Sequence, residues 1–295
     1  MILKHIIYKC ILIAQKNITV IKYICGDFLS KYKFSIKDRL IGANLCVYGY
    51  GNNIEEKVDI LDDKFNCITL KPFKIIVPNT TFKPGELAYI YNETFLPSNV
   101  NPHSYETDFI RVKKDDVVID AGACEGLFSL YSLNSGARSV YMFEPAKQLQ
   151  LGLAKTFEKE INNGNISLID KGLSDKIGFL RFKNDEKYIC MAKLDNCGSE
   201  LVEVTTLDDF VFSNKISNIN FIKADIEGAE VDLIKGAIKT LKQFKPKLSI
   251  AVYHKYENAE LIKSLILKNC PEYKVRFGGC YMFEIPYRPF MLYAY

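Results

Sequence analysis

The stretch VVIDAGACEGL, residues 117–127, decides the fold of this chain. Its apolar start is typical of a buried strand, and the loop that follows contains Gly122 and Gly126, which let the backbone turn sharply and let a ligand approach it closely. A second apolar run, residues 139–143, ends at Glu144. A strand, a glycine loop, a helix and a second strand that ends in an acid form the arrangement by which an open α/β sheet holds the ribose of a nucleoside cofactor.

The spacing of the loop glycines indicates which kind of cofactor binds. A dinucleotide site reads Gly-x-Gly-x-x-Gly and places a pyrophosphate on the helix N-terminus, whereas this loop reads Gly-x-x-x-Gly and carries Glu125, whose charge would repel a diphosphate. Glu144 follows Asp120 by 24 positions, near the spacing at which the acid of the second strand reaches ribose hydroxyls. The pattern therefore favours a cofactor without phosphates, and S-adenosylmethionine is the candidate.

From residue 105 onward, strand and helix patterns alternate, which is typical of a mainly parallel sheet with helices on both faces. We expect strands over residues 117–120, 139–144, 166–170, 220–225 and 247–254, helices over 148–162, 231–241 and 260–270, and closing antiparallel strands over 274–277 and 289–295. The earlier part predicts short strands at 45–48, 58–61, 67–70 and 74–77. We therefore predict an α/β protein with a partly β N-terminal appendage and linking segment at 1–104 and a catalytic domain at 105–295.

The composition excludes several classes of protein. Hydrophobic residues make up 48% of the chain and charged residues 25%, as in ordinary globular proteins, and the net charge of +4 comes from scattered lysines, so no nucleic-acid surface is predicted. The nine cysteines include no Cys-x-x-Cys pair, which predicts reduced thiols and a cytoplasmic location. Residues 1–14 are apolar only in patches, so we predict no transmembrane segment. Peripheral membrane contact and the oligomeric state stay open.

Three side chains at the ends of later strands are candidates for acid–base chemistry. Asp225 and Glu227 follow one apolar strand and His254 ends the next, so all three are expected at the carboxyl edge of the sheet, where ligands bind. We predict that His254 or Asp225 takes a proton from the acceptor and that Glu227 orients that acceptor. The alternatives are a structural histidine and acids that only complement a helix dipole. Asp225, Glu227 and His254 could in principle bind a metal ion, but no ligand spacing typical of a metal site requires one. No metal is predicted, and whether one assists stays open.

Six motifs stand in order along the chain: DAGACEG from Asp120, FEP from Phe143, GLSD from Gly172, TLDDF from Thr206, KADIEGAE from Lys223, and the strand that ends at His254. Together they resemble the FkbM-type family of S-adenosylmethionine-dependent methyltransferases. The resemblance spans residues 105–295 and implies a Rossmann-like class I methyltransferase fold with a mostly parallel seven-stranded sheet. It also implies methyl transfer to hydroxyl oxygens, often those of sugars.

The same resemblance implies which residues bind the cofactor. Glu106 would lie beside its methionine end, and the loop at 172–175 beside its adenine. The full predicted set is Glu106, Asp120, Gly122, Ala123, Glu125, Gly126, Glu144, Gly172, Ser174 and Asp175.

These observations predict a methyltransferase that acts on a hydroxyl of a small molecule or of a glycan, in surface polysaccharides or glycosylated natural products. Acceptor specificity is expected from the N-terminal appendage and from loops such as 185–200. Two other classes stay open. A nicotinamide-dependent oxidoreductase is disfavoured by the missing middle glycine and by Glu125. A non-catalytic protein could also have kept the fold and the cofactor.

Overall fold

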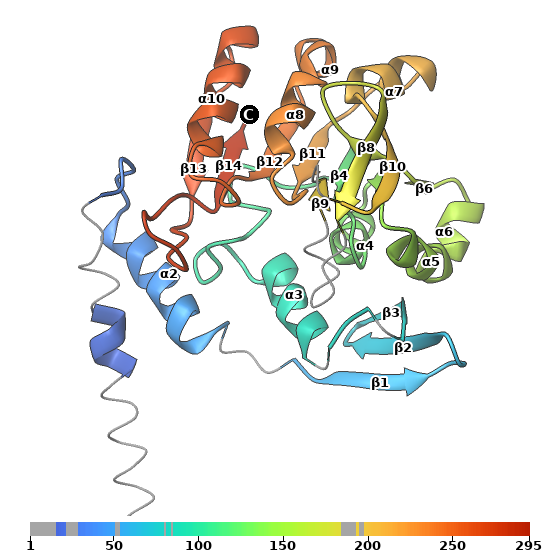
Figure 1. Ribbon diagram of the computed structural model, residues 1–295, viewed down its shortest axis with the longest axis horizontal. Coiled ribbons are helices and arrows are strands. Elements are labelled where there is room, and N and C mark those ends of the chain that lie inside the picture. The colour runs from blue at the N-terminus through green and yellow to red at the C-terminus, as the bar shows by residue number, and fades with distance from the viewer. Residues whose placement is uncertain are drawn as a thin grey trace, which may run out of the picture.

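The computed structural model describes residues 16–21, 29–50, 54–79, 81–83, 85–183, 193–194 and 198–295, with the backbone alone at 193–194. These residues form a seven-stranded sheet whose strands, in spatial order, are β13 (Val275–Gly278), β14 (Met291–Ala294), β12 (Lys247–Ala251), β11 (Phe221–Ala224), β4 (Val117–Ala121), β5 (Ser139–Phe143) and β6 (Ile166–Ile169) (Figure 1). Only β14 pairs antiparallel with its neighbours in this sheet. The predicted α/β fold with a mostly parallel sheet is confirmed.

Helices cover both faces of the sheet because successive side chains of a strand point to opposite sides. Ile119 and Ile222 pack in the hydrophobic core of one face, which is covered by α7 (Leu207–Ser213), α8 (Glu230–Lys235), α9 (Ile238–Phe244) and α10 (Asn258–Asn269). Val118 and Phe221 pack in the core of the other face, which is covered by α4 (Leu127–Asn134) and α5 (Lys147–Thr156). In Figure 1 these two groups of helices lie above and below the sheet.

Two predicted helices are each divided in the structure. Residues 148–162 form α5 and then α6 (Glu158–Asn162), with the break at the buried Phe157. Residues 231–241 are shared between α8 and α9, which are separated at Gly236, where an added Cβ would lie 2.1 Å from the carbonyl oxygen of Ser174. Apolar side chains keep a helical spacing across both breaks, so periodicity alone predicts continuous helices.

The N-terminal part contains an antiparallel sheet of β1 (Glu56–Ile60), β2 (Phe65–Leu70) and β3 (Phe73–Pro78), together with α2 (Ile36–Tyr48) and α3 (Glu86–Phe95). Its predicted partly β character is confirmed. The strand predicted at 45–48 is wrong, because these residues are the last turn of α2. That helix begins after Ser35, whose side chain accepts a hydrogen bond from the backbone N–H of Asp38. A short apolar run alone cannot distinguish a strand from part of a helix.

The N-terminal part packs directly on the helices of the larger sheet. The backbone N–H of Ile76 donates a hydrogen bond to Oγ1 of Thr156 at 2.7 Å, and an added Cβ at Gly152 would lie 2.7 Å from the carbonyl oxygen of Ile76. Leu87 of α3 and Leu127 of α4 share one hydrophobic cluster. The division of the chain at residue 104 stays a prediction.

A second small sheet was not predicted from the sequence. Its strands, in spatial order, are β7 (Gly172–Leu173), β10 (Glu200–Thr205), β8 (Gly178–Lys183) and β9 (Lys193–Leu194). Phe182 and Val204 of this sheet pack with Leu149 of α5. The loop at 185–200 was expected to confer acceptor specificity. Most of it, residues 185–192 and 195–197, lies outside the described residues.

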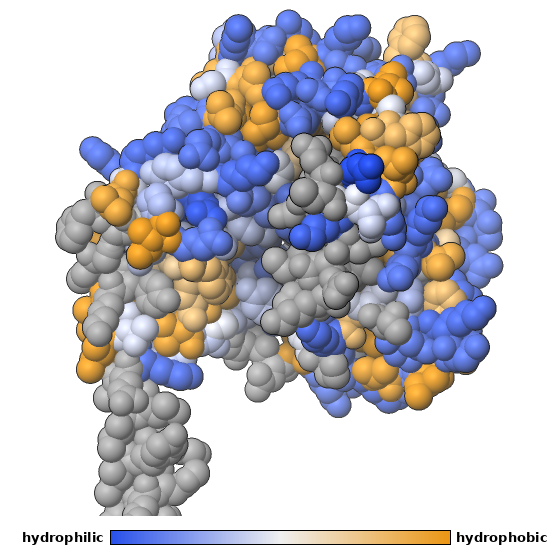
Figure 2. Space-filling model, viewed as in Figure 1, coloured by the Kyte–Doolittle hydropathy of each residue, from blue (hydrophilic) through white to orange (hydrophobic). Residues whose placement is uncertain are grey.

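Hydrophilic side chains cover much of the face shown in Figure 2, and hydrophobic ones form separate groups among them. Scattered apolar side chains of this kind are normal on a globular surface. Across the described ranges, no helix combines the length and the apolar character that crossing a membrane requires.

Lys223 of β11 and Asp120 of β4 form a buried ion pair at the centre of the sheet. The two residues face each other in the parallel register, with Nζ and Oδ1 3.1 Å apart and side chains 5% and 0% exposed. The Lys223 ammonium also donates a hydrogen bond to the carbonyl oxygen of Gly122 at 2.7 Å. Burial alone would lower the pKa of Lys223, but the carboxylates of Asp120 and Asp225 outweigh it and raise this pKa. The lysine is therefore charged, and it depends on these partners.

We predict that Asp120→Ala lowers the free energy of unfolding by about 3–5 kcal/mol, because it leaves the Lys223 ammonium buried without its main partner. Asp232→Ala is the control. It breaks the exposed pair in which Nζ of Lys235 lies 2.8 Å from Oδ1 of Asp232, and it should cost at most about 1 kcal/mol. Urea unfolding followed by circular dichroism measures both values, and equal losses would contradict the prediction.

Candidate active site

A cavity of about 1340 Å³ lies at the carboxyl ends of β4 and β11. Its walls include the loop after β4, the loop after β11, the residues after β12, and α3 of the N-terminal part. The strand order reverses between β4 and β11, and open α/β sheets bind their ligands at such a switch point. The cavity is large enough for a nucleoside cofactor and an acceptor together.

Residues 122–126, which we call the donor loop, depend on two glycines. Gly122 has a φ of +79°, and a Cβ there would lie 2.0 Å from the carbonyl oxygen of Asp225. Gly126 has a φ of +89° and precedes α4, where a Cβ would lie 2.5 Å from the ring of Phe157. Side chains at these positions would be strained by the backbone and would clash as well. The two glycines therefore let the donor loop pack against β11 and α5.

Two buried carboxylates hold the donor loop. Oε2 of Glu144 accepts a hydrogen bond from the backbone N–H of Cys124 at 3.0 Å, and Oε1 accepts one from Ala146 at 2.9 Å. Oε1 of Glu125 accepts one from the backbone N–H of Leu127 at 3.2 Å, at the start of α4. Burial raises the pKa of each carboxyl group to about 7. Glu125 therefore takes the place at the helix N-terminus that a dinucleotide's pyrophosphate would need.

The structure brings most of the predicted cofactor residues to one place. The five that line the cavity directly are Gly122, Ala123, Glu125, Ser174 and Asp175. Four more support the loops that form the wall: Asp120 and Glu144 through the contacts above, Gly126 at the start of α4, and Gly172 in β7. Whether these residues bind the cofactor stays a prediction.

Glu106 is the predicted cofactor residue that the structure places apart from the others. Its Oε1 accepts a hydrogen bond from the backbone N–H of Val112 at 2.6 Å, and its Oε2 accepts one from the hydroxyl of Tyr131 at 2.5 Å. It is not among the described residues that line the cavity. Both oxygens therefore support the segment that leads into β4, and the predicted contact with the methionine end has no geometric support.

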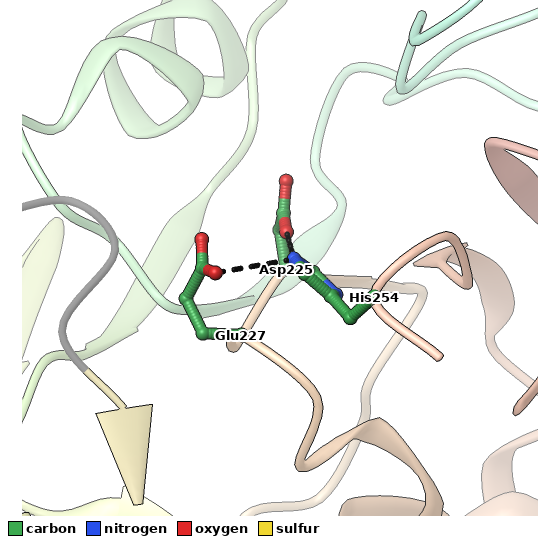
Figure 3. A group of neighbouring side chains, drawn as sticks. All are labelled: Asp225, Glu227 and His254. Atoms are coloured by element: carbon green, nitrogen blue, oxygen red, sulfur yellow. Dashed lines mark ion pairs between the residues drawn. The ribbon is translucent and has the colours of Figure 1, made fainter. Parts of the chain in front are cut away.

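Asp225, Glu227 and His254 also line the cavity and lie together, as predicted, and we call them the acid–histidine cluster (Figure 3). We call the part of the cavity around them the acceptor end. Nε2 of His254 lies 3.5 Å from Oδ1 of Asp225 and 3.4 Å from Oε2 of Glu227. Nδ1 of the same ring lies 3.0 Å from Oε1 of Glu230, which is fully buried. The cluster thus arises from the ends of two adjacent parallel strands, β11 and β12.

Two buried residues from the segment before β4 complete the cluster. Nε2 of His103 lies 3.2 Å from Oδ2 of Asp225, and Nδ1 of His103 lies 3.1 Å from a carboxylate oxygen of Glu93 in α3. The hydroxyl of Tyr105 donates a hydrogen bond to the same Oδ2 at 2.8 Å. Oδ2 of Asp225 is therefore occupied, while Oδ1 faces His254.

The sequence assigned no role to His103, Tyr105, Glu93 or Lys223. His103 and Tyr105 follow a proline-rich segment, and Glu93 lies in the last turn of α3, so no motif marked them. Lys223 stands within a motif, on the strand itself. Only the folded arrangement brings these groups to Asp225.

The charges of the cluster depend on one another. Burial alone would raise the pKa of Asp225, but His103, His254 and Lys223 hold it well below its usual range. Burial alone would lower the pKa of both histidines, but the surrounding carboxylates raise the pKa of His103 to about 9 and that of His254 well above 6.5. Burial raises the pKa of Glu227. Asp225 is therefore a weak proton acceptor.

A sequence profile described as "Methyltransferase FkbM domain" matches residues 120–271, just over half of the chain. The chain belongs to the FkbM methyltransferase family. The matched residues include the donor loop, Glu144 and the acid–histidine cluster. The resemblance seen in the sequence is thereby confirmed, and a family of methyltransferases does not support the nicotinamide-dependent alternative.

Among solved structures, the chain is similar to methyltransferase FkbM from Methylobacillus flagellatus KT, with 19% identity and a TM-score of 0.52 over 95% of this chain and 59% of that one. This likeness supports the shared fold, and the chain spans about three fifths of that relative's length. A weaker likeness is to SMU.1697c from Streptococcus mutans in complex with SAH, with 18% identity and a TM-score of 0.34 over 72% of this chain and 97% of that one. Another is to a fibrillarin pre-rRNA processing protein from Methanococcus jannaschii, with 14% identity and a TM-score of 0.39 over 81% of this chain and 96% of that one. No curated protein matches the chain.

S-adenosylmethionine is the methyl donor of this family, and the donor loop fits it. This cofactor carries a transferable methyl group on a positively charged sulfur and has no phosphate. Gly122 lets a ligand approach the backbone, and the carboxylate of Glu125 at the start of α4 disfavours a diphosphate there. Each oxygen of Glu144 uses one lone pair on the backbone, which leaves acceptor capacity for two ribose hydroxyls, although Glu144 itself is not among the described residues that line the cavity.

Gly122→Ala is predicted to weaken binding of S-adenosylhomocysteine by more than tenfold, because its Cβ would displace the donor loop from Asp225. Gly164→Ala is a matched control. Gly164 has a similar φ of +76° but no atom within 4 Å of an added Cβ, so the backbone strain is the same and the clash is absent. Isothermal titration calorimetry compares the two, and equal losses of affinity would show that the close approach is unimportant.

If Glu144 binds the ribose hydroxyls, its ionised form is the better acceptor, and affinity should rise with pH through its pKa of about 7. We therefore expect S-adenosylhomocysteine to bind several-fold more tightly at pH 8 than at pH 6. Glu144→Gln should bind S-adenosylhomocysteine weakly at both pH values and lose most of the pH dependence of its affinity. A wild-type affinity that stays constant across this range would contradict the role of Glu144.

Proposed function

We propose that this chain transfers a methyl group from S-adenosylmethionine to a hydroxyl oxygen of a sugar-containing acceptor. The main support is that the donor loop and the acid–histidine cluster line the same cavity. The loop has the features of a cofactor site, and the cluster offers carboxylates and an imidazole for a hydroxyl group. Transfer by in-line displacement needs such a pairing, because the acceptor oxygen must face the methyl group directly.

The protein has two tasks in this reaction, to align the acceptor oxygen and to take up its proton. Asp225 is suited to the first, since Tyr105 and His103 fix its carboxylate and keep it ionised. The proton then passes to the pair formed by His254 and Glu227, whose Nε2 and Oε2 atoms lie 3.4 Å apart. This narrows the hypothesis drawn from the sequence, in which His254 or Asp225 accepts the proton.

Aromatic side chains around the acceptor end support a sugar. Tyr89, Tyr253 and Tyr281 line the cavity, and the rings of Tyr253 and Tyr281 stack with centroids 5.0 Å apart. Flat rings of this kind pack well against the apolar faces of a sugar and leave its hydroxyls free for polar partners. A glycan of a surface polysaccharide or of a glycosylated natural product fits this wall.

The charges that line the cavity are mixed. Acidic side chains such as Glu86 and Glu227 stand beside basic ones such as Lys83 and Arg181, and Glu284 pairs with Arg288. The lining therefore forms no continuous basic surface of the kind that binds the phosphates of a nucleic acid. The cytoplasmic location that we propose is supported by free cysteines at the described positions 46, 67 and 270.

We predict that His254→Ala and Glu227→Gln each reduce turnover by at least about 100-fold while leaving the affinity for S-adenosylhomocysteine within about twofold. Asp232→Asn is the control, because Asp232 lines the cavity but pairs with Lys235 outside the cluster. The assay measures methyl incorporation from labelled S-adenosylmethionine into a panel of glycosides and lipid-linked glycans. Full turnover by both cluster variants would disprove their role. Cofactor binding without any methylated product would favour the non-catalytic alternative.

A further inference from the structure

The acid–histidine cluster has the layout of a cation site. One ligand atom from each of Asp225, Glu227 and His254 lies within 4.8 Å of the other two. Figure 3 shows Glu227 and Asp225 near the same end of the His254 ring, with both ion pairs directed at one nitrogen. Glu227 reaches this place with a φ of +55°, which is uncommon for a residue other than glycine. Such strain is typical of functional sites.

Glu230 fixes which nitrogen of His254 faces the two acids. Its Oε1 lies 3.0 Å from Nδ1 and also accepts hydrogen bonds from the backbone N–H groups of Ile226 at 3.1 Å and Gly228 at 3.2 Å. This carboxylate is fully buried and acts only as an acceptor when ionised, so the proton of the imidazole belongs on Nδ1. When the ring is neutral, the lone pair of Nε2 then points at Asp225 and Glu227. Histidines that bind metals are oriented in this way by a second carboxylate.

The distances around Nε2 are too long for strong hydrogen bonds. A charge-assisted N–H···O contact is about 2.7–2.9 Å long, whereas Nε2 lies 3.5 Å from Asp225 and 3.4 Å from Glu227. One N–H group shared between two acceptors at these distances makes only a weak, bifurcated hydrogen bond. Oδ1 of Asp225 and both ring nitrogens of His254 are buried and make no hydrogen bond of good geometry among the described residues, so Nδ1 meets Glu230 as an ion pair only. The His254 side chain is 9% exposed.

The same distances fit atoms that share a metal ion. Neighbouring ligands lie roughly 3.0–3.5 Å apart when the metal–ligand bonds are about 2.0–2.5 Å long. Two carboxylates balance the charge of a divalent cation, and a neutral imidazole completes a set of three ligands. Oδ2 of Asp225 is held by Tyr105 and His103, which leaves Oδ1 for the ion.

We propose that Asp225 Oδ1, Glu227 Oε2 and His254 Nε2 bind a divalent cation of the Mn²⁺ type. Carboxylates suit Mn²⁺ and Mg²⁺ and imidazole suits the first-row transition metals, so Mn²⁺ matches the mixed set. Three protein ligands leave coordination positions open toward the cavity. The ligands come from the ends of two strands and are far apart in the sequence, which explains why no metal-site spacing was found there.

The open coordination positions of the cation suggest its role in the reaction, and this role rests on the proposed function. The acceptor hydroxyl would occupy one of them, and the cation would lower the pKa of that hydroxyl. Its O–H bond breaks, and the proton goes to the oxygen of Glu227 that does not bind the ion. The acceptor oxygen then forms the new C–O bond while the methyl carbon leaves sulfur, which keeps the electron pair of the broken C–S bond.

The binding test uses the full chain, treated with EDTA, desalted and titrated with Mn²⁺ alone, while electron paramagnetic resonance measures the free ion. We expect one tight site per chain, weakened at least tenfold in His254→Gln and in Asp225→Asn. Asp232→Asn is the control, since its carboxylate lines the same cavity and lies outside the cluster. Binding of S-adenosylhomocysteine and circular dichroism confirm that each variant is folded.

A second measurement tests the ligand directly. Bound Mn²⁺ should show electron spin-echo modulation from an imidazole nitrogen, and His254→Gln should remove it. Absence of a tight Mn²⁺ site in wild-type protein that binds S-adenosylhomocysteine would overturn the proposal and identify the cluster as an imidazolium held by three carboxylates. Because no acceptor is present, these results do not depend on methyl transfer. A failed acceptor screen would therefore count against the proposed function alone.

Discussion

The site depends on one buried contact, the ion pair between Lys223 and Asp120. Taking two charges out of water costs more than a well-packed apolar pair would, so this pair is better understood as a positioning device than as a source of stability. The Lys223 ammonium binds the carbonyl oxygen of Gly122 and, by its charge, keeps Asp225 ionised. A single side chain therefore connects the donor loop to the acid–histidine cluster.

The N-terminal part contributes to the same site rather than standing apart from it. His103 lies between Glu93 of α3 and Asp225, and Tyr105 donates to Asp225 from the following segment. Glu93 and Tyr89 bring α3 to the cavity wall, while the small sheet behind it packs on α5. Variation in this part of the chain would therefore change both the shape of the acceptor end and the charge state of Asp225.

The acceptor end concentrates opposite charges in a buried space. Asp225, Glu227 and Glu230 surround His254, and His103 and Lys223 provide positive charge beside Asp225. Buried carboxylates are costly unless a cation or a proton accompanies them. This constraint accounts for the raised pKa of His254 in the ion-free protein, where a proton supplies the positive charge. It also accounts for the fit of a divalent cation in place of that proton. Either way, the positive charge lies where an acceptor hydroxyl would lose its proton.

The amino-acid sequence by itself determined the sheet, the donor loop and the three cluster residues, because these features follow local rules. Apolar runs form strands, glycines mark the turn at 122–126, and parallel strands end at a common edge, so Asp225, Glu227 and His254 could be placed together. Only the tertiary structure decided that residues 45–48 are helical, that Glu106 supports Val112 and Tyr131, and that His103 joins the site. These outcomes depend on contacts between segments far apart in the chain, and no local pattern of residues encodes such contacts.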